Sequence, residues 1–263
     1  MVNKPIVGVA ALIVVLAAGG VYYLRSRNAP LPAAPGAAAT APAAGEPAIA
    51  HPLPSAGSGS PSAPLPDLAN SDSSLRDALA QLAGADAVKA YLVPEDVIRR
   101  IVVTIDNLPR QKIAVDKRPT TAIGGTFAAT GDELHATLNQ QNFERYKPLV
   151  AAISKLDMQQ LGGVYIHFYP LFQQAYQNLG YPNGYFNDRL VEVIDAMLAT
   201  PEPKGPIQLV RPNVMYTFAD PALEARPAGQ KLLIRMGPEN AQTVKAKLTE
   251  LRAVITAGPL KHQ

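Results

Sequence analysis

The stretch Tyr165–Leu198, YIHFYPLFQQAYQNLGYPNGYFNDRLVEVIDAML, decides the fold that the sequence predicts. Of the chain's 10 Tyr and 6 Phe residues, eight lie between Tyr165 and Phe186. Large aromatic side chains dominate the energetics of burial. We therefore place the centre of the hydrophobic core in this stretch.

The same stretch predicts two helices joined by a tight corner. The first helix runs to Leu179, because Gly180 is the usual kind of residue just past a helix end. Residues 181–184, Tyr-Pro-Asn-Gly, have strong turn chemistry. The second helix is expected to begin near Asn187, a good N-cap. Its apolar residues fill one arc and its charged residues the opposite arc.

Length and composition limit the class of protein. The 263 residues carry a net charge of +3 and no cysteine, which excludes disulfides, thiolate metal sites and cysteine nucleophiles. From residue 67 onward the chain holds 21 basic and 20 acidic residues. This part is close to neutral, so nucleic acid is not an expected partner.

An apolar run near the N-terminus predicts a transmembrane anchor within residues 1–28. Ile6–Leu24 contains 19 residues without a charge, and as a helix it would span ~28 Å, about one hydrocarbon thickness. A cleaved signal peptide is the competing interpretation, since Ala17, Ala18 and Gly19 suit a cleavage site. The length of the run favours the anchor. The flanking charges do not by themselves favour a cytoplasmic N-terminus.

Residues 29–66 are predicted to be a disordered linker rich in Pro and Ala. Ten of these 38 residues are proline, 13 are alanine, and Glu46 is the only charged one. Such a segment has almost nothing to bury and favours polyproline conformations. It would hold a globular domain away from the bilayer, by roughly 35 Å as a coil and up to about 120 Å when extended.

Residues 67–263 form the predicted globular domain, which is mainly α-helical with a small β-hairpin or short strands. Thr126–Thr130 and Glu133–Leu138 flank Gly131-Asp132 and alternate with a period of two, which predicts the hairpin. Val214–Phe218 is a further expected strand. Apolar stripes and capping residues predict helices over 71–84, 94–107, 143–153, 157–179, 187–199, 221–224, 229–236 and from Pro238 onward.

Three stretches of this domain carry a family resemblance: LFQQAYQNLGYPNGYFNDRLVEVIDAMLATP from Leu171, RPNVMYTFADPALEA from Arg211 and GQKLLIRMGPENAQTVKAKLTELR from Gly229. Through them the chain resembles the domain-of-unknown-function 3014 family over roughly residues 67–257. The resemblance implies a bacterial protein with an N-terminal membrane span, a Pro/Ala-rich linker and one C-terminal domain. It also favours a cytoplasmic N-terminus and a periplasmic domain at the inner membrane. It supplies no catalytic residues.

The candidate binding residues gather at the corner within nine positions of the sequence: Tyr181, Tyr185, Asn187, Asp188 and Arg189. Aromatic rings beside a guanidinium and an amide suit a sugar or a peptide. A purely structural interpretation is also open. In that case the tyrosines complete the core, Asn187 caps the helix, and Arg189 pairs with Glu192 or Asp220.

Other groups offer weaker candidates. Asp188, Glu192 and Asp195 share a helix face and can serve as paired carboxylates, although a solvated face is the simpler expectation. Four cations would form an anion pocket only if they converge, and ion pairs are the simpler alternative: Arg211, Arg226, Lys231 and Arg235. His135 and His167 have no second ligand at metal spacing. We therefore expect no metal site and no cofactor, and no nucleotide-binding or hydrolase motif occurs.

These features favour a membrane-tethered binding or scaffold module of the bacterial cell envelope. Its partners would be the inner membrane, through one span, and an envelope protein or a glycan. The alternative is an envelope hydrolase that uses carboxylates on the 187–199 helix. An oligomerisation module is a third possibility, to be judged by an exposed apolar patch. No residue is assigned a catalytic role.

Overall fold

The structure is a computed structural model of the chain, and it describes residues 49–54, 64–111, 113–132, 135–212 and 215–256. Within these residues the fold has nine α-helices and one small four-stranded antiparallel sheet. The predicted mainly helical class with short strands is confirmed. No helix in the described ranges is long and apolar enough to cross a bilayer. The predicted span Ile6–Leu24 lies outside those ranges.

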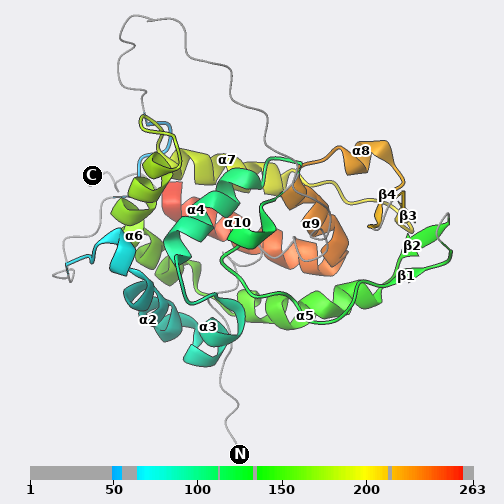
Figure 1. Cartoon of the computed structure of the whole chain (residues 1–263), viewed down its shortest axis with the longest axis horizontal. Coiled ribbons are helices and arrows are strands. Elements are labelled where there is room, and N and C mark those ends of the chain that lie inside the picture. Colours follow the sequence, from blue (N-terminus) through cyan, green and yellow to red (C-terminus); the bar gives the residue numbers. More distant parts are fainter. Residues whose placement is uncertain (1–48, 55–63, 112, 133–134, 213–214, 257–263) are drawn as a thin grey trace, which may run out of the picture.

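The last helix, α10 (Pro238–Thr256), runs through the middle of the helical body (Figure 1). One side of this helix carries the apolar residues that predicted it, and all four are buried: Val244, Leu248, Leu251 and Ile255. It contacts four other helices, which are α5 (Gln141–Ser154), α6 (Met158–Asn178), α7 (Phe186–Leu198) and α9 (Ala228–Met236). Helix α10 is thus the common partner around which the aromatic α6–α7 pair is assembled.

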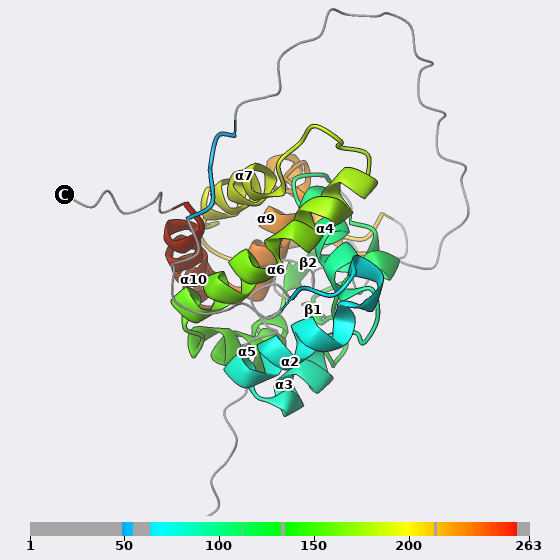
Figure 2. The same cartoon turned by 90° about the vertical axis from the view of Figure 1, so that its left-hand side faces the viewer.

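The N-terminal helices cover the other side of α6 (Figure 2). Helix α4 (Val97–Asn107) packs on α6 and α7, and its predicted apolar stripe is buried. Helix α2 (Asp72–Ala83) packs on α6 and on α3 (Ala85–Tyr91). Two short 3-10 turns complete this part, η2 (Leu68–Asn70) and η3 (Val115–Lys117).

Two helix starts differ from the sequence prediction. Helix α4 begins at Val97 and not at Pro94. Asp72 is one of three N-cap candidates, residues 71–73, for the helix expected at 71–84, but its carboxylate instead accepts hydrogen bonds from the amides of Asp96 and Val97, both at 2.8 Å. Helix α3 was not predicted, because its seven residues are too few for a periodic apolar pattern.

Helix α6 approaches α10 closely at Gly162. A Cβ atom at this position would clash with Cγ1 of Val254, so a larger residue would force the Val254 side chain to shift. The neighbouring Gly163 has open space around it. Helix α5 continues through Pro148 and helix α6 through Pro170, so neither proline ends its helix.

The small sheet lies at one end of the helical body (Figure 1). Its strands follow one another in space as β1 (Ala129–Thr130), β2 (Ala136–Leu138), β3 (Gln208–Val210) and β4 (Thr217–Phe218). The predicted hairpin is confirmed, with Ala129 opposite Leu138. Strand β3 was not predicted, because its three residues are too few to show alternation. A second apolar cluster beneath the sheet includes Leu209, Phe218 and Ile234. Beyond β4, Asp220 caps the short α8 (Pro221–Glu224) as predicted.

Candidate binding site at the α6–α7 corner

Stacked aromatic rings fix the corner between α6 and α7. The rings of Phe172 and Phe186 are parallel to within 3° with centroids 5.6 Å apart, and those of Tyr176 and Tyr181 stack at 4.6 Å. Gly180 turns the chain after α6 with φ of +115°, a conformation that favours glycine. Asp157 caps the start of α6 as predicted, accepting from the amides of Gln159 and Gln160.

The predicted N-cap of α7 is wrong. The helix begins at Phe186, and the capping position belongs to Tyr185, a half-buried residue whose side chain makes no capping hydrogen bond. Asn187 lies one position inside the helix and is only 1% exposed. Its side chain is therefore available for contacts with other parts of the chain.

Arg189 and Tyr181 converge on Asp106, a buried carboxylate at the end of α4. The Tyr181 hydroxyl donates to Oδ2 of Asp106 at 3.3 Å, and Arg110 donates to the same oxygen at 2.6 Å. Nη2 of Arg189 donates to the carbonyl oxygen of Asp106 at 2.8 Å and lies 3.1 Å from its Oδ1. Nη1 donates to Glu192 at 2.8 Å. The pairing of Arg189 with Glu192 follows one of the two structural expectations, whereas the partner Asp106 was not foreseen.

The acids around Arg189 also affect its pKa. Burial acts to lower the pKa of Arg189, but Glu192 and Asp106 outweigh this effect and raise it. Burial also raises the pKa of Tyr176, the ring on which Tyr181 stacks. Arg189 and Tyr181 thus fasten α7 and the corner to α4.

Asn187 and Asp188 bind a segment of the same chain more than 130 positions earlier. Oδ2 of Asp188 accepts from the amide of Ala50 at 3.0 Å, and Oδ1 accepts from the amide of His51 at 2.6 Å. Nδ2 of Asn187 donates to the carbonyl oxygen of His51 at 2.8 Å. Leu53 of the same segment packs against the main core. Residues 49–54 therefore lie against the α6–α7 corner, next to the end of α10 (Figure 2).

The disordered linker at residues 29–66 stays a prediction, but parts of this segment have contacts with the domain. Ala50 and His51 are bound by hydrogen bonds to α7, and Leu53 and Leu65 pack against the main core. Leu53 offers apolar surface, and Pro52 and Pro54 restrict the backbone, so less entropy is lost on docking. Residues 29–48 and 55–63 lie outside the described ranges.

Asn187 is itself held firmly in place. Its Oδ1 accepts from the hydroxyl of Tyr165 at 3.1 Å, and its Nδ2 also donates to the carbonyl oxygen of Ile255 at 3.2 Å. Burial raises the pKa of Tyr165 well above its usual value, so this hydroxyl remains a donor. The amide is thus pre-positioned toward His51 by α6 and α10.

The three acidic residues on α7 do not form a catalytic pair. Asp188 binds the two backbone amides, and Glu192 pairs with Arg189. Asp195 accepts two hydrogen bonds from Arg252, at 2.6 and 3.0 Å. The hydrogen bond from Arg252 lowers the pKa of Asp195. Each carboxylate has a different partner, and this arrangement gives no support to a shared general acid and base.

The four cations considered as an anion pocket also have separate surroundings. Lys231 pairs with Glu224 at 2.8 Å, and Arg226 donates to Gln230 at 3.1 Å. Arg235 lies over the ring of Phe218 at 4.7 Å, and Arg211 lies over the ring of Tyr216 at 5.6 Å. The sequence left convergence of the four open, and these separate partners give no support to a shared anion pocket.

The histidines have structural neighbours. His135 lies 3.3 Å from Oδ1 of Asp132 on the exposed hairpin, and the ring of His167 meets that of Phe168 edge to face. In the part of the chain that the structure describes, no group of three His, Cys, Asp or Glu side chains could hold a metal ion.

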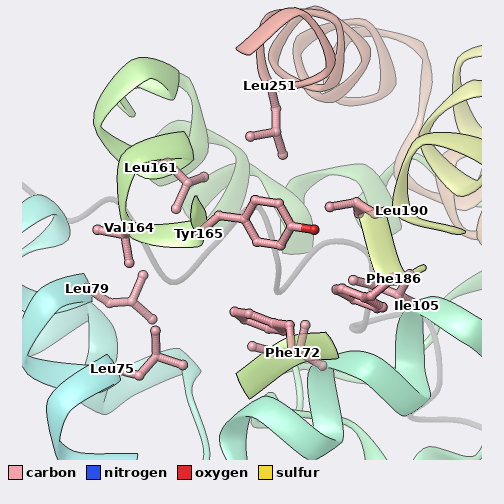
Figure 3. Close-up of a pocket in the computed structure, with 11 residues that line it drawn as sticks. Leu75, Leu79, Ile105, Leu161, Val164, Tyr165, Phe172, Phe186, Leu190 and Leu251 are labelled. Carbon is pink, nitrogen blue, oxygen red and sulfur yellow. The ribbon is translucent and has the colours of Figure 1, made fainter. Parts of the chain in front are cut away.

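A small cavity lies inside the helical body, with Tyr165 projecting into it (Figure 3). Its volume is about 30 Å³. It lies between α2, α4, α6, α7 and α10, and its walls are apolar side chains such as Leu79, Phe172 and Leu251. A space of this size could hold one or two water molecules, but apolar walls give them no partners. The cavity is too small for a substrate or cofactor.

Comparison with known proteins identifies the family. Residues 97–252 match the family model described as "Protein of unknown function (DUF3014)". This match covers more than half of the chain, so the protein belongs to that family, as the sequence motifs indicated. No curated protein and no solved structure matches.

Sequence reasoning missed two parts of this site. One feature of the sequence could have drawn attention to Asp106, because it is an acidic residue directly after the apolar stripe of α4. Its Arg189 partner is 83 positions away, a pairing that spacing cannot supply. The docking of residues 49–54 has no signal in composition, because the hydrogen bonds go to backbone atoms that every sequence has.

Proposed function

We propose that this protein is a membrane-tethered binding or scaffold module of the bacterial cell envelope that binds extended peptide segments at the α6–α7 corner. The domain would face the periplasm, anchored by Ile6–Leu24. The observation that carries the proposal is the occupation of the corner by residues 49–54. The anchor and the orientation rest on the apolar run and on the family resemblance.

The contacts suit a peptide better than a glycan. Asp188 accepts from two successive amides, and Asn187 donates to the carbonyl group that follows. This set of two donors and one acceptor, in order along a chain, is what a peptide backbone presents. Backbone contacts provide affinity, while side chains next to them provide specificity. Leu53 packing on the core would be the side chain that selects.

In this view residues 49–54 occupy the site in cis and compete with a partner. When two binding partners belong to one chain and are joined by a short linker, their effective concentration is of the order of millimolar. A partner peptide must therefore bind tightly enough, or through enough further contacts, to displace residues 49–54 at this effective concentration. The tether would thus set the affinity that a partner needs.

A peptide-displacement experiment tests this proposal. In one variant of the full chain, residues 49–54 are deleted, which removes the backbone groups and the Leu53 side chain that occupy the corner. Binding of a labelled peptide with the sequence of residues 45–56 is measured by fluorescence polarisation in detergent. The opened chain should bind the peptide at least about tenfold more tightly than the unaltered chain, because the competing segment is gone.

Two further variants locate the binding. In the opened chain, Asp188→Ala should abolish peptide binding. Asp157→Ala removes a carboxylate that also accepts from two successive amides, at the start of α6, and should leave binding unchanged. If the opened chain fails to bind the peptide, or if Asp188→Ala binds it equally well, the proposal is wrong.

A further inference from the structure

Every leucine of the Pro/Ala-rich segment before the domain lies between two prolines. Residues 29–66 contain three leucines, and each is part of the sequence Pro-Leu-Pro, at 30–32, 52–54 and 64–66. The two residues before each copy are not prolines, so both carry a backbone N–H group. The segment therefore repeats one motif three times, which is two non-proline residues followed by Pro-Leu-Pro.

The structure describes two of these Pro-Leu-Pro copies, and both lie against the domain in the same way. In each copy the first proline is exposed, whereas the leucine and the second proline are half-buried. Leu53 and Leu65 both pack against the main core, although the first copy follows the residues bound to α7 and the second leads into η2. The domain thus binds a leucine between two prolines at two separate places.

The α6–α7 corner binds backbone groups that every copy of the motif supplies. Asp188 accepts hydrogen bonds from the amides of the two residues before Pro52. Asn187 donates to the carbonyl oxygen of the second of these residues. Because a proline restricts the residue before it to extended conformations, the motif is largely extended before it docks. Less conformational entropy is then lost on binding.

We propose that the corner recognises this motif and that residues 28–32, Asn-Ala-Pro-Leu-Pro, are its second occupant within the same chain. This exchange of occupants rests on the proposed function, because it requires the corner to bind extended segments. Residues 28–32 lie outside the described ranges, and their sequence makes them the match. Their first two residues carry the N–H groups that Asp188 would bind, and Leu31 would take the place of Leu53.

Loop length decides which of the two occupants prevails. Nine residues, 55–63, join the docked segment to the domain, whereas 31 residues, 33–63, would join residues 28–32 to it. The probability that a flexible loop closes falls with about the 3/2 power of its length, which disfavours the second occupant by about sixfold. Ala29 would also replace the half-buried His51 and lose its side-chain contacts. The second occupant therefore docks chiefly when the first is absent.

The exchange would change the distance between the domain and the proposed membrane span that ends at Leu24. With residues 49–54 docked, residues 25–48 join the span to the corner and can extend over about 80 Å. With residues 28–32 docked, only residues 25–27 remain, which reach about 10 Å. Release of the first occupant would therefore draw the domain toward the bilayer.

The opened chain, which lacks residues 49–54, tests the second occupant by peptide binding. In this chain residues 28–32 remain as a weaker competitor for the labelled peptide of residues 45–56. Leu31→Ser should remove most of this competition, so that the peptide binds at least about twofold more tightly in fluorescence polarisation. Pro42→Ser is the matched control, because Pro42 belongs to no Pro-Leu-Pro copy, and it should leave the affinity unchanged.

Amide hydrogen exchange detects the second occupant directly. In the opened chain the amides of Asn28 and Ala29 should exchange at least about twofold more slowly than in the same chain carrying Asp188→Ala. In the unaltered chain their exchange should be close to that of an unstructured chain, because the first occupant holds the corner. Protection that rises with protein concentration would overturn the same-chain occupant in favour of a second copy of the protein.

The outcomes separate this inference from the proposed function. Suppose that the opened chain binds the labelled peptide equally well with and without Leu31→Ser, or that Asp188→Ala leaves the exchange of Asn28 and Ala29 unchanged. Residues 28–32 are then not the second occupant, while peptide binding at the corner stands. If the opened chain does not bind the peptide at all, the proposed function is wrong and the exchange of occupants is overturned with it.

Discussion

Replacing Arg189 by alanine should destabilise the domain substantially, because it removes one of two arginines that hold a buried carboxylate. The side chain of Asp106 is 3% exposed and that of Arg189 is 19% exposed. Breaking a fully buried ion pair costs about 3–5 kcal/mol. Arg110 stays at 2.6 Å from Asp106, and Arg189 is partly solvated. We therefore expect a loss of about 2–3 kcal/mol, which includes the hydrogen bond to the Asp106 carbonyl group.

Thermal unfolding followed by circular dichroism measures this loss. For a domain of this size, each 1 kcal/mol changes the melting temperature by about 2–4 °C, so Arg189→Ala should lower it by about 5–10 °C. Arg252→Ala is the matched control, since Arg252 also binds a carboxylate with two hydrogen bonds. Its pair with Asp195 is exposed, and such pairs contribute less than about 1 kcal/mol.

The comparison separates two roles for Arg189. A structural role requires Arg189→Ala to melt well below Arg252→Ala. The reasoning is refuted if the two variants melt at the same temperature. A variant that keeps its melting temperature but loses peptide binding would instead place Arg189 in the binding site itself.

Three other outcomes are expected. Gly162→Ala should destabilise the domain by about 1–3 kcal/mol because the added methyl group meets α10, whereas Gly163→Ala, on the exposed face of the same helix, should be neutral or stabilise by up to about 1 kcal/mol. Equal effects in chemical denaturation would contradict the close approach. Asp195 has a lowered pKa in the folded state, so its pair with Arg252 stabilises above the unfolded pKa, about 4, and this contribution is lost as the pH falls through the folded pKa. The difference in melting temperature between Arg252→Ala and the unaltered chain should therefore shrink between pH 7 and pH 2. A reporter enzyme that works only in the periplasm should be active when fused after Gln263, and activity of a cytoplasm-only reporter would contradict the proposed orientation.

Local patterns in the sequence were sufficient to predict most helices. The stripe of α10 and the cap at Asp157 are confirmed because both depend on residues within one or two turns of each other. The corner after Gly180 was predicted for the same reason. Two short elements were not predicted. Helix α3 has seven residues and strand β3 has three, which are too few to show a periodic apolar pattern.

Contacts between distant parts of the chain could not be predicted in this way. The carboxylate of Asp72 caps α4 and not its own helix, because the tertiary structure brings the starts of α2 and α4 together. Asn187 had the right residue type for a cap, but the tertiary structure uses it to bind His51 and Ile255. The candidate residues of the corner do lie close together in the fold. Their partners, Asp106 and residues 49–54, belong to distant parts of the chain and not to the corner.

Amide hydrogen exchange at Ala50 and His51 in the full chain tests the docked segment most directly. If the carboxylate of Asp188 binds both amides, they should exchange at least about tenfold more slowly than an unstructured chain, and Asp188→Ala should remove this protection. Asp157→Ala is the control, because Asp157 also accepts from two successive amides but at the start of α6. Its loss should leave both amides protected. Rapid exchange of these two amides in the unaltered chain, or protection that survives Asp188→Ala, would contradict the account.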